Sequence, residues 1–345
     1  MRPLLRSMCT EGLTRTLLLP ALISMACAEP SEPHPCAIPG EEGEVVVCEG
    51  GATALAADAT SLYWVSGVDF SGWRSSIDCE RVNCAAPALY SLSHEGGEPD
   101  TLAMLEGTPR ALDLGPTIIV STSAGLWEIG YRGGVTPLGG TGPPGSISTF
   151  ATRDGSLWRA QDREILRGNL PTAVAPPPHT VVTDDEPILA LAVSDELLVW
   201  TTFVHPEDEA WTRRTLFAQR TDEPGSEVFS LADDLGLVSD LAIDAHHVVW
   251  RDTNERVWSR DLRTDAPAVL LAEHVTAFAV HDGALYHGRR RGVHNVALES
   301  VPLSGGPSTT LVTYETEKVF WLPSVAIHDG YVYWSDTRIM RKPLD

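Results

Sequence analysis

The sequence is short of basic residues and of long apolar runs. Its 345 residues carry 25 Lys and Arg against 47 Asp and Glu, which gives a net charge of −22. This balance argues against nucleic-acid binding, because contact with a phosphate backbone needs clustered cations that displace counterions. No stretch beyond residue 26 approaches the roughly 18 apolar residues that a membrane-spanning helix needs. Transmembrane helices are therefore not expected in the body of the chain.

Familiar catalytic motifs are also missing. The sequence has no EF-hand loop, no Walker loop and no GxSxG elbow. His281-Asp282-Gly283 and His328-Asp329-Gly330 carry neighbouring His and Asp, but Asp-Gly is typical of turns, and we interpret both as turns rather than relays. We predict no catalytic residue, no metal ligand and no cofactor. Enzymatic activity is left open, with a non-enzymatic role favoured.

The N-terminus has the features of an export signal. Arg2, Arg6 and Arg15 precede an apolar run over residues 16–26, and small residues then flank Cys27. Residues 1–26 are predicted to be a signal peptide. Residues 27–43, rich in Pro and Glu, are predicted to be a tether. The body of the protein is therefore expected outside the cytoplasm.

The segment Ser24-Met25-Ala26-Cys27 resembles a bacterial lipobox, although an aliphatic residue is usual where Ser24 stands. The resemblance implies that Cys27 is lipidated and anchors the protein in the bacterial envelope. This anchor would be the only contact with a membrane. Cleavage after Ala26 without lipidation is the alternative, and it would leave the protein periplasmic or secreted.

The remaining cysteines favour disulfides over a metal site. The chain has six Cys. Cys9 lies in the predicted signal peptide, and four others follow Cys27. Local pairing of Cys36 with Cys48 and of Cys79 with Cys84 is the simplest of the connectivities open to four cysteines. Zinc is disfavoured because the Cys-x4-Cys pair lacks a matching second pair and disulfides persist in exported proteins.

A ten-residue block recurs along the chain and predicts the fold. Each copy reads as a strand, a tight turn and a second strand, with Asp, Gly, Ser and His in the turn. The second position is usually Ala, which suits crowded innermost strands. The tenth position is Trp at 64, 200, 250 and 334, and we predict that these side chains pack between blades rather than against a ligand. The copies cover residues 55–64, 112–121, 150–159, 191–200, 241–250, 278–287 and 325–334.

A third and a fourth strand are predicted after each block. Four antiparallel strands repeated about every 40–45 residues are typical of a β-propeller. The last copy ends after its third strand, whereas an extra strand, Glu44-Val45-Val46-Val47, precedes the first copy. We therefore predict an all-β chain with a single propeller over residues 44–345. It would have seven four-stranded blades, closed by the N-terminal strand.

Two family resemblances accompany this pattern. Tyr333-Trp334-Ser335-Asp336 resembles the YWTD signature of the propellers of the low-density-lipoprotein-receptor class, with Ser in place of Thr. The whole repeat pattern also resembles propeller lipoproteins of myxobacteria. Both resemblances cover residues 44–345 and imply the fold without implying a function. YWTD propellers typically have six blades, so six blades remain the alternative.

The longest insertions point to one face of the propeller. The segments 66–87 and 201–214 are expected between second and third strands, and 173–187 and 313–324 between a fourth strand and the next first strand. Connections of these two kinds lie on the same face, which we call the long-loop face. Since binding residues concentrate on loops held by a rigid scaffold, we predict a binding site there. Its candidate residues are Phe70, Trp73, Trp211, Phe320, Trp321 and Arg290.

Structural interpretations of the same residues remain open. The aromatic side chains could instead cap the loops, and Arg290 could lie in a solvated hairpin. The favoured hypothesis is a monomeric, exported binding or scaffold module for a protein or a glycan. One alternative is a lactonase-like propeller hydrolase or lyase with a metal in the central channel. The other is a structural envelope lipoprotein.

Overall fold

The computed structural model describes the larger part of the chain, all of it within the compact unit Pro35–Asp345. The described residues form strands and turns, and a search among them for a helix able to span a bilayer finds none. The described ranges are 43–47, 52–66, 87–138, 149–172, 175–202, 214–222, 225–235, 238–244, 246–292, 295–315, 324–335 and 338–344.

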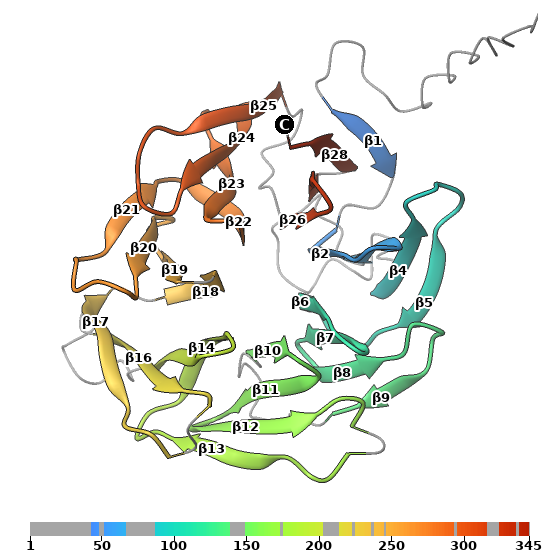
Figure 1. Cartoon of the computed structure of the whole chain (residues 1–345). Coiled ribbons are helices and arrows are strands. Elements are labelled where there is room, and N and C mark those ends of the chain that lie inside the picture. The colour runs from blue at the N-terminus through green and yellow to red at the C-terminus, as the bar shows by residue number, and fades with distance from the viewer. Residues whose placement is uncertain are drawn as a thin grey trace, which may run out of the picture. The chain divides into compact units, whose positions relative to one another are not determined.

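Seven four-stranded antiparallel sheets make up this unit. In Figure 1, the strands β2, β6, β10, β14, β18, β22 and β26 surround the centre, and each sheet runs outward from one of them. The chain is a seven-bladed β-propeller. The prediction of seven blades is confirmed, and the alternative of six is wrong.

Each blade consists of four strands, ordered from the innermost outward. Blades one to four are β2 (Ala54–Ala57), β3 (Ser61–Ser66), β4 (Ala88–Ser93), β5 (Asp100–Met104); β6 (Pro109–Leu114), β7 (Ile118–Thr122), β8 (Gly125–Ile129), β9 (Val135–Pro137); β10 (Phe150–Arg153), β11 (Ser156–Gln161), β12 (Glu164–Asn169), β13 (His179–Thr183); and β14 (Ile188–Val193), β15 (Leu197–Thr202), β16 (Arg214–Arg220), β17 (Phe229–Leu235). Blades five to seven are β18 (Val238–Asp244), β19 (His247–Asp252), β20 (Val257–Asp261), β21 (Val269–Ala272); β22 (Val275–His281), β23 (Ala284–Arg290), β24 (Asn295–Pro302), β25 (Thr309–Glu315); and β26 (Ser324–His328), β27 (Tyr331–Ser335), β28 (Ile339–Pro343), β1 (Glu44–Val47).

The N-terminal strand completes the seventh blade, as predicted. Strand β1 pairs antiparallel with β28, with Glu44 opposite Arg341 and Val45 opposite Met340. The Arg341 guanidinium donates to the Glu44 carboxylate through Nε at 2.8 Å. This pairing removes the free edge that β28 would otherwise present, and an exposed strand edge favours association with other chains.

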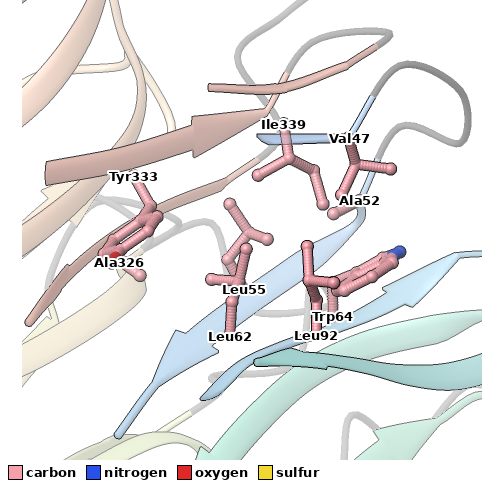
Figure 2. Close-up of a cluster of buried hydrophobic side chains, with 9 residues drawn as sticks. All are labelled: Val47, Ala52, Leu55, Leu62, Trp64, Leu92, Ala326, Tyr333 and Ile339. Atoms are coloured by element: carbon pink, nitrogen blue, oxygen red, sulfur yellow. The ribbon is translucent and has the colours of Figure 1, made fainter. Parts of the chain in front are cut away.

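The tryptophans at the tenth position of the repeat pack between blades. Trp64, Trp200, Trp250 and Trp334 are all buried. Figure 2 shows Trp64 of blade one close to Leu92, in a cluster that also takes in Tyr333 and Ile339 of blade seven. These tryptophans therefore hold neighbouring sheets together, which confirms their predicted role.

The tight turns between first and second strands explain the His-Asp-Gly motifs. Asp282 and Gly283 have φ values of 47° and 72°, and Asp329 and Gly330 have 46° and 73°. Positive φ at both central residues is typical of the two-residue hairpin turns that match strand twist. The interpretation of these motifs as turns is therefore confirmed.

Three of the four long insertions connect the strands that we predicted. Residues 67–87 join β3 to β4, residues 203–213 join β15 to β16, and residues 316–323 join β25 to β26. The fourth prediction is wrong, because the segment 173–187 contains β13. Its insertion joins the third and fourth strands of blade three and so belongs to the opposite face. The run Pro176-Pro177-Pro178 obscured this strand, since proline cannot donate to a ladder and pairing begins only at His179.

Candidate ligand-binding site at the channel mouth

Most of the binding residues and cysteines that we predicted from the sequence lie outside the described residues. Phe70, Trp73, Trp211, Phe320 and Trp321 lie outside the described residues. The same holds for Cys27 and for the cysteines of the predicted disulfides, Cys36, Cys48, Cys79 and Cys84. The loop aromatics, the lipid anchor and the disulfides therefore stay predictions.

Arg290 can be placed, and its position corrects one detail. It is the last residue of β23 and pairs in register with Val296, so it extends the hairpin of blade six instead of lying in the loop. It is exposed on the long-loop face, because second strands end there. Its guanidinium lies 3.9 Å from the carboxylate of Glu255 in the neighbouring blade five. A partly exposed pair at this distance contributes about 1 kcal/mol or less.

A cavity opens at the centre of the long-loop face. Its volume is about 280 Å³, and it is lined mainly by the beginnings of innermost strands. Each innermost strand starts where the chain arrives from the fourth strand of the preceding blade, so these beginnings meet at the channel mouth on this face. Strands β2, β6, β18, β22 and β26 contribute, which places five of the seven blades around one cavity.

Backbone bulges shape this mouth. The register of the first two strands shifts near the start of β6, between Pro109 and Ala111, and near the start of β22, between Val275 and Ala277. Blades four and five have equivalent shifts. A bulge inserts one extra residue and re-aims the side chain there. Arg110 is the extra residue of β6, and it lines the cavity.

One ion pair stiffens the rim. Arg251, near the end of β19, donates from Nε to the Asp240 carboxylate at 2.8 Å. Its Nη1 also donates to the carbonyl oxygens of Val275, at 3.2 Å, and of Thr276. The Arg251 side chain is only 20% exposed. This residue therefore links blade five to blade six and contributes little net charge to the cavity, because Asp240 balances it.

Arg110 differs from Arg251 in having no such partner. It is exposed, and within the described part of the chain no hydrogen bond or ion pair involves its guanidinium. The charged residues of the lining are Arg110, Arg251 and Asp240. The cavity therefore carries one net positive charge in a protein whose net charge is −22.

The uncharged lining combines hydroxyl groups with apolar walls. Thr53 donates its hydroxyl to the carbonyl of Val65 at 2.9 Å, and Thr276 donates to the carbonyl of Gly288 at 3.4 Å. Both threonine oxygens therefore keep lone pairs that can accept. Ser324 Oγ accepts the amide of Leu55 at 3.0 Å, so its proton is available to donate. Apolar walls come from Leu55, Leu112, Leu241, Phe278 and Val325.

These cavity residues were missed because the repeat was aligned two residues too late. Thr53 and Ala54 immediately precede the first block, Arg110 and Ala111 precede the second, and Thr276 and Ala277 precede the sixth. An alignment extended upstream by two positions would have marked Arg110 as the cation in a column otherwise rich in Thr and Ser. An arginine in this column is the sequence feature that could have pointed to the cavity.

Asp113 stands where most blades have Ala at the second position of the repeat. Its carboxylate accepts from Thr152 of the neighbouring blade through the amide, at 2.9 Å, and through the hydroxyl, at 2.8 Å. Burial raises the pKa of Asp113 above its usual value, and these hydrogen bonds lower it again in part. The arrangement ties blade two to blade three.

His287 breaks the pattern at the tenth position, where four blades have Trp. Its side chain is fully buried, and its Nε2 lies 3.9 Å from Oε2 of the buried Glu299. Arg291 binds the other carboxylate oxygen of Glu299, and Arg289 approaches to 3.6 Å. Burial lowers the pKa of His287 to about 4, against smaller opposing effects such as the Glu299 charge.

Metal ligation has no support in the described residues, where no group of three or more His, Cys, Asp or Glu side chains is placed to hold an ion. The cavity lining contains a single carboxylate, Asp240, and Arg251 already engages it.

Comparison with known proteins agrees with the fold and goes no further. No known protein family and no curated protein matches the sequence. Among solved structures, the WD40 β-propeller domain of Doa1 is similar, with 11% identity and a TM-score of 0.57 over 87% of this chain and 95% of that one. Puromycin hydrolase shares 13% identity with a TM-score of 0.56, over 86% of this chain and 52% of that one.

A third similar structure is PorZ, an essential bacterial surface component of the type-IX secretion system of Porphyromonas gingivalis. It shares 10% identity with a TM-score of 0.56, over 88% of this chain and 38% of that one. The chain thus spans about half of puromycin hydrolase and less than half of PorZ. At these identities the similarities establish the propeller fold alone.

Proposed function

We propose that this protein is an exported, monomeric binding module that holds a protein or a glycan at its long-loop face, centred on the channel mouth. The observation that carries the proposal is the cavity of about 280 Å³ built by five blades, lined by an arginine that has no partner among the described residues. Ligand sites are concave and supplied with a few placed polar groups, and this cavity combines three hydroxyl groups and two arginines with apolar walls. Export rests on the features of residues 1–26, and envelope anchoring rests on Cys27.

A binding role fits the described residues better than a channel hydrolase or lyase does. Such an enzyme needs several carboxylate, Asn or His groups that converge on a metal. The cavity lining offers hydroxyl groups, apolar walls, two arginines and a single carboxylate, Asp240, which Arg251 already engages. The similarity to puromycin hydrolase gives no further weight to an enzyme, because it extends over only 52% of that protein.

The proposal can be tested by filling the cavity. Thr276→Tyr would place a ring in the channel mouth, and Thr309→Tyr makes the same change at an exposed position of β25 in the same blade. Both variants and the unmodified protein would be applied to glycan arrays and titrated with the glycans that bind. We expect Thr276→Tyr to abolish binding and Thr309→Tyr to leave it unchanged.

Two results would contradict the proposal. If bound glycans are retained by Thr276→Tyr, the channel mouth is not the binding site. If the unmodified protein binds neither the arrayed glycans nor envelope proteins in pairwise titrations, the structural role becomes the better hypothesis.

A further inference from the structure

Unlike most other described arginines of the propeller, Arg110 forms no ion pair with a described carboxylate. In a chain with this excess of acidic residues, arginines usually find a carboxylate, and six described examples are Arg153, Arg220, Arg251, Arg256, Arg263 and Arg341. Arg110 has no carboxylate partner within the described residues, although it stands in the lining of a cavity. Low-dielectric walls focus the field of a charge in a concave site, so an anion is attracted there more strongly than at an open surface.

Arg110 is the only charged residue of the cavity lining whose charge is not balanced by a neighbour within the lining. Asp240 and Arg251 neutralise each other through a hydrogen bond of 2.8 Å. A ligand that matches the site therefore carries one negative charge. Guanidinium groups bind planar oxyanions through paired hydrogen bonds, and a carboxylate is the simplest partner of that shape.

The hydroxyl groups of the lining point to a hydroxylated ligand body. Thr53 and Thr276 retain acceptor capacity, and Ser324 retains a donor. A sugar ring presents hydroxyl groups that act as both donors and acceptors, with apolar C–H faces that can rest on Leu112 and Phe278. A volume of about 280 Å³ lies at the small end of the ~300–1,000 Å³ typical of ligand pockets, which suits a ligand the size of one sugar ring.

We propose that the channel mouth binds the carboxylate of a hydroxylated organic acid the size of one sugar ring, with a uronic acid as the expected member of this class. Arg110 binds the carboxylate, and the Thr and Ser hydroxyl groups bind the ring. This inference rests on the proposed function, since it assigns a ligand class to the same cavity. It leaves open whether the acid is free or is the terminal residue of a glycan.

The test compares ligands that differ only in the carboxylate. Glucuronate and galacturonate would be titrated calorimetrically against glucose and galactose, with hexanoate as an acid that lacks hydroxyl groups. We expect one uronate to bind at least about tenfold more tightly than its neutral sugar and than hexanoate. An oligosaccharide that ends in the same uronate distinguishes the two sources, because tighter binding than the monosaccharide identifies a glycan end.

Substitutions of charged residues then test whether Arg110 is the side chain that binds the carboxylate. Arg110→Gln should weaken uronate binding by about 10- to 100-fold, the range expected for hydrogen bonds to a charged group. Its binding of the neutral sugar should not change. The matched control is Arg132→Gln, which removes the same charge from an exposed turn of the same blade on the opposite face. Asp240→Asn should strengthen uronate binding, because it leaves Arg251 without its balancing charge.

The outcomes separate this inference from the function on which it rests. Equal binding of uronate and neutral sugar, or an unchanged affinity in Arg110→Gln, would overturn the carboxylate assignment. Hexanoate binding as tightly as the uronate would overturn the sugar assignment. If Thr276→Tyr blocks a neutral ligand while Arg110→Gln does not, this inference fails and the proposed function stands. If Thr276→Tyr blocks nothing, both fail.

Discussion

Replacing His287 by glutamine is expected to remove a defined part of the acid sensitivity of the propeller. His287 is fully buried in blade six, and burial lowers its pKa to about 4. The groups that face it are Glu299, which favours its protonation, and Arg289, which disfavours it. In the unfolded chain an ordinary histidine has a pKa of about 6.5.

The sign and the size of the effect follow from these two values. Because the folded pKa is the lower one, the unfolded chain binds more protons between about pH 6.5 and pH 4, and the free energy of unfolding falls as the pH falls through that window. A pKa lowered from about 6.5 to about 4 corresponds to roughly 3 kcal/mol, since each pKa unit is worth ~1.36 kcal/mol. Most of this contribution should already be lost at pH 4.5.

The measurement is urea unfolding at pH 7 and at pH 4.5 for three proteins: the unmodified chain, His287→Gln and His179→Gln. His179 lies exposed on β13 and serves as the control for removal of a histidine. The loss of stability between the two pH values should be about 2 to 3 kcal/mol smaller for His287→Gln than for the other two. An unchanged pH dependence in His287→Gln, or an NMR titration of His287 near pH 6.5, would refute the reasoning.

Three further changes probe the packing and the closure of the ring. Trp334→Ala empties a fully buried site between blades six and seven and should lower the free energy of unfolding by about 3–5 kcal/mol in urea, whereas a loss below 1 kcal/mol would contradict inter-blade packing. Val45→Asp buries a carboxylate on the closing strand and should release β1, so gel filtration should show association that increases with concentration as the β28 edge becomes free. Glu128→Ala removes the acceptor of the Thr172 amide and should cost about 1–3 kcal/mol, with faster hydrogen exchange at that amide as the specific readout.

Much of the fold could be predicted because the repeat is local and its columns have different physical roles. Apolar strand pairs around Asp-Gly turns identify hairpins, and Trp at the tenth position of the block identifies the packing between blades. The closure could be predicted because Glu44–Val47 was an unpaired strand at one end and a strand was missing at the other. Strand β13 was missed because three prolines precede it. A run of prolines is compatible both with a long loop and with the residues just before a strand, so the sequence did not distinguish the two.

The sequence analysis predicted the face of the propeller on which the candidate site lies, but not the residues that line the cavity. Five blades contribute to the cavity, and their residues are separated by up to most of the chain, from Thr53 to Ser324. Only the ring closure brings them together. The position of Arg110 depends in addition on a bulge in β6, and no residue type marks a bulge in a sequence by itself.

Departures from the repeat separate structural from functional residues once their surroundings are known. Asp113, His287 and Arg110 each replace the residue that their column usually has, and from the sequence alone all three are equal candidates. Asp113 accepts two hydrogen bonds from Thr152 of the neighbouring blade, and His287 is buried beside Glu299 within its own blade, so both have structural surroundings. Arg110 alone of the three is exposed, lines a cavity and has no partner in the described chain. A charge that the described residues leave unpaired where five blades meet is best explained by a ligand that pairs with it.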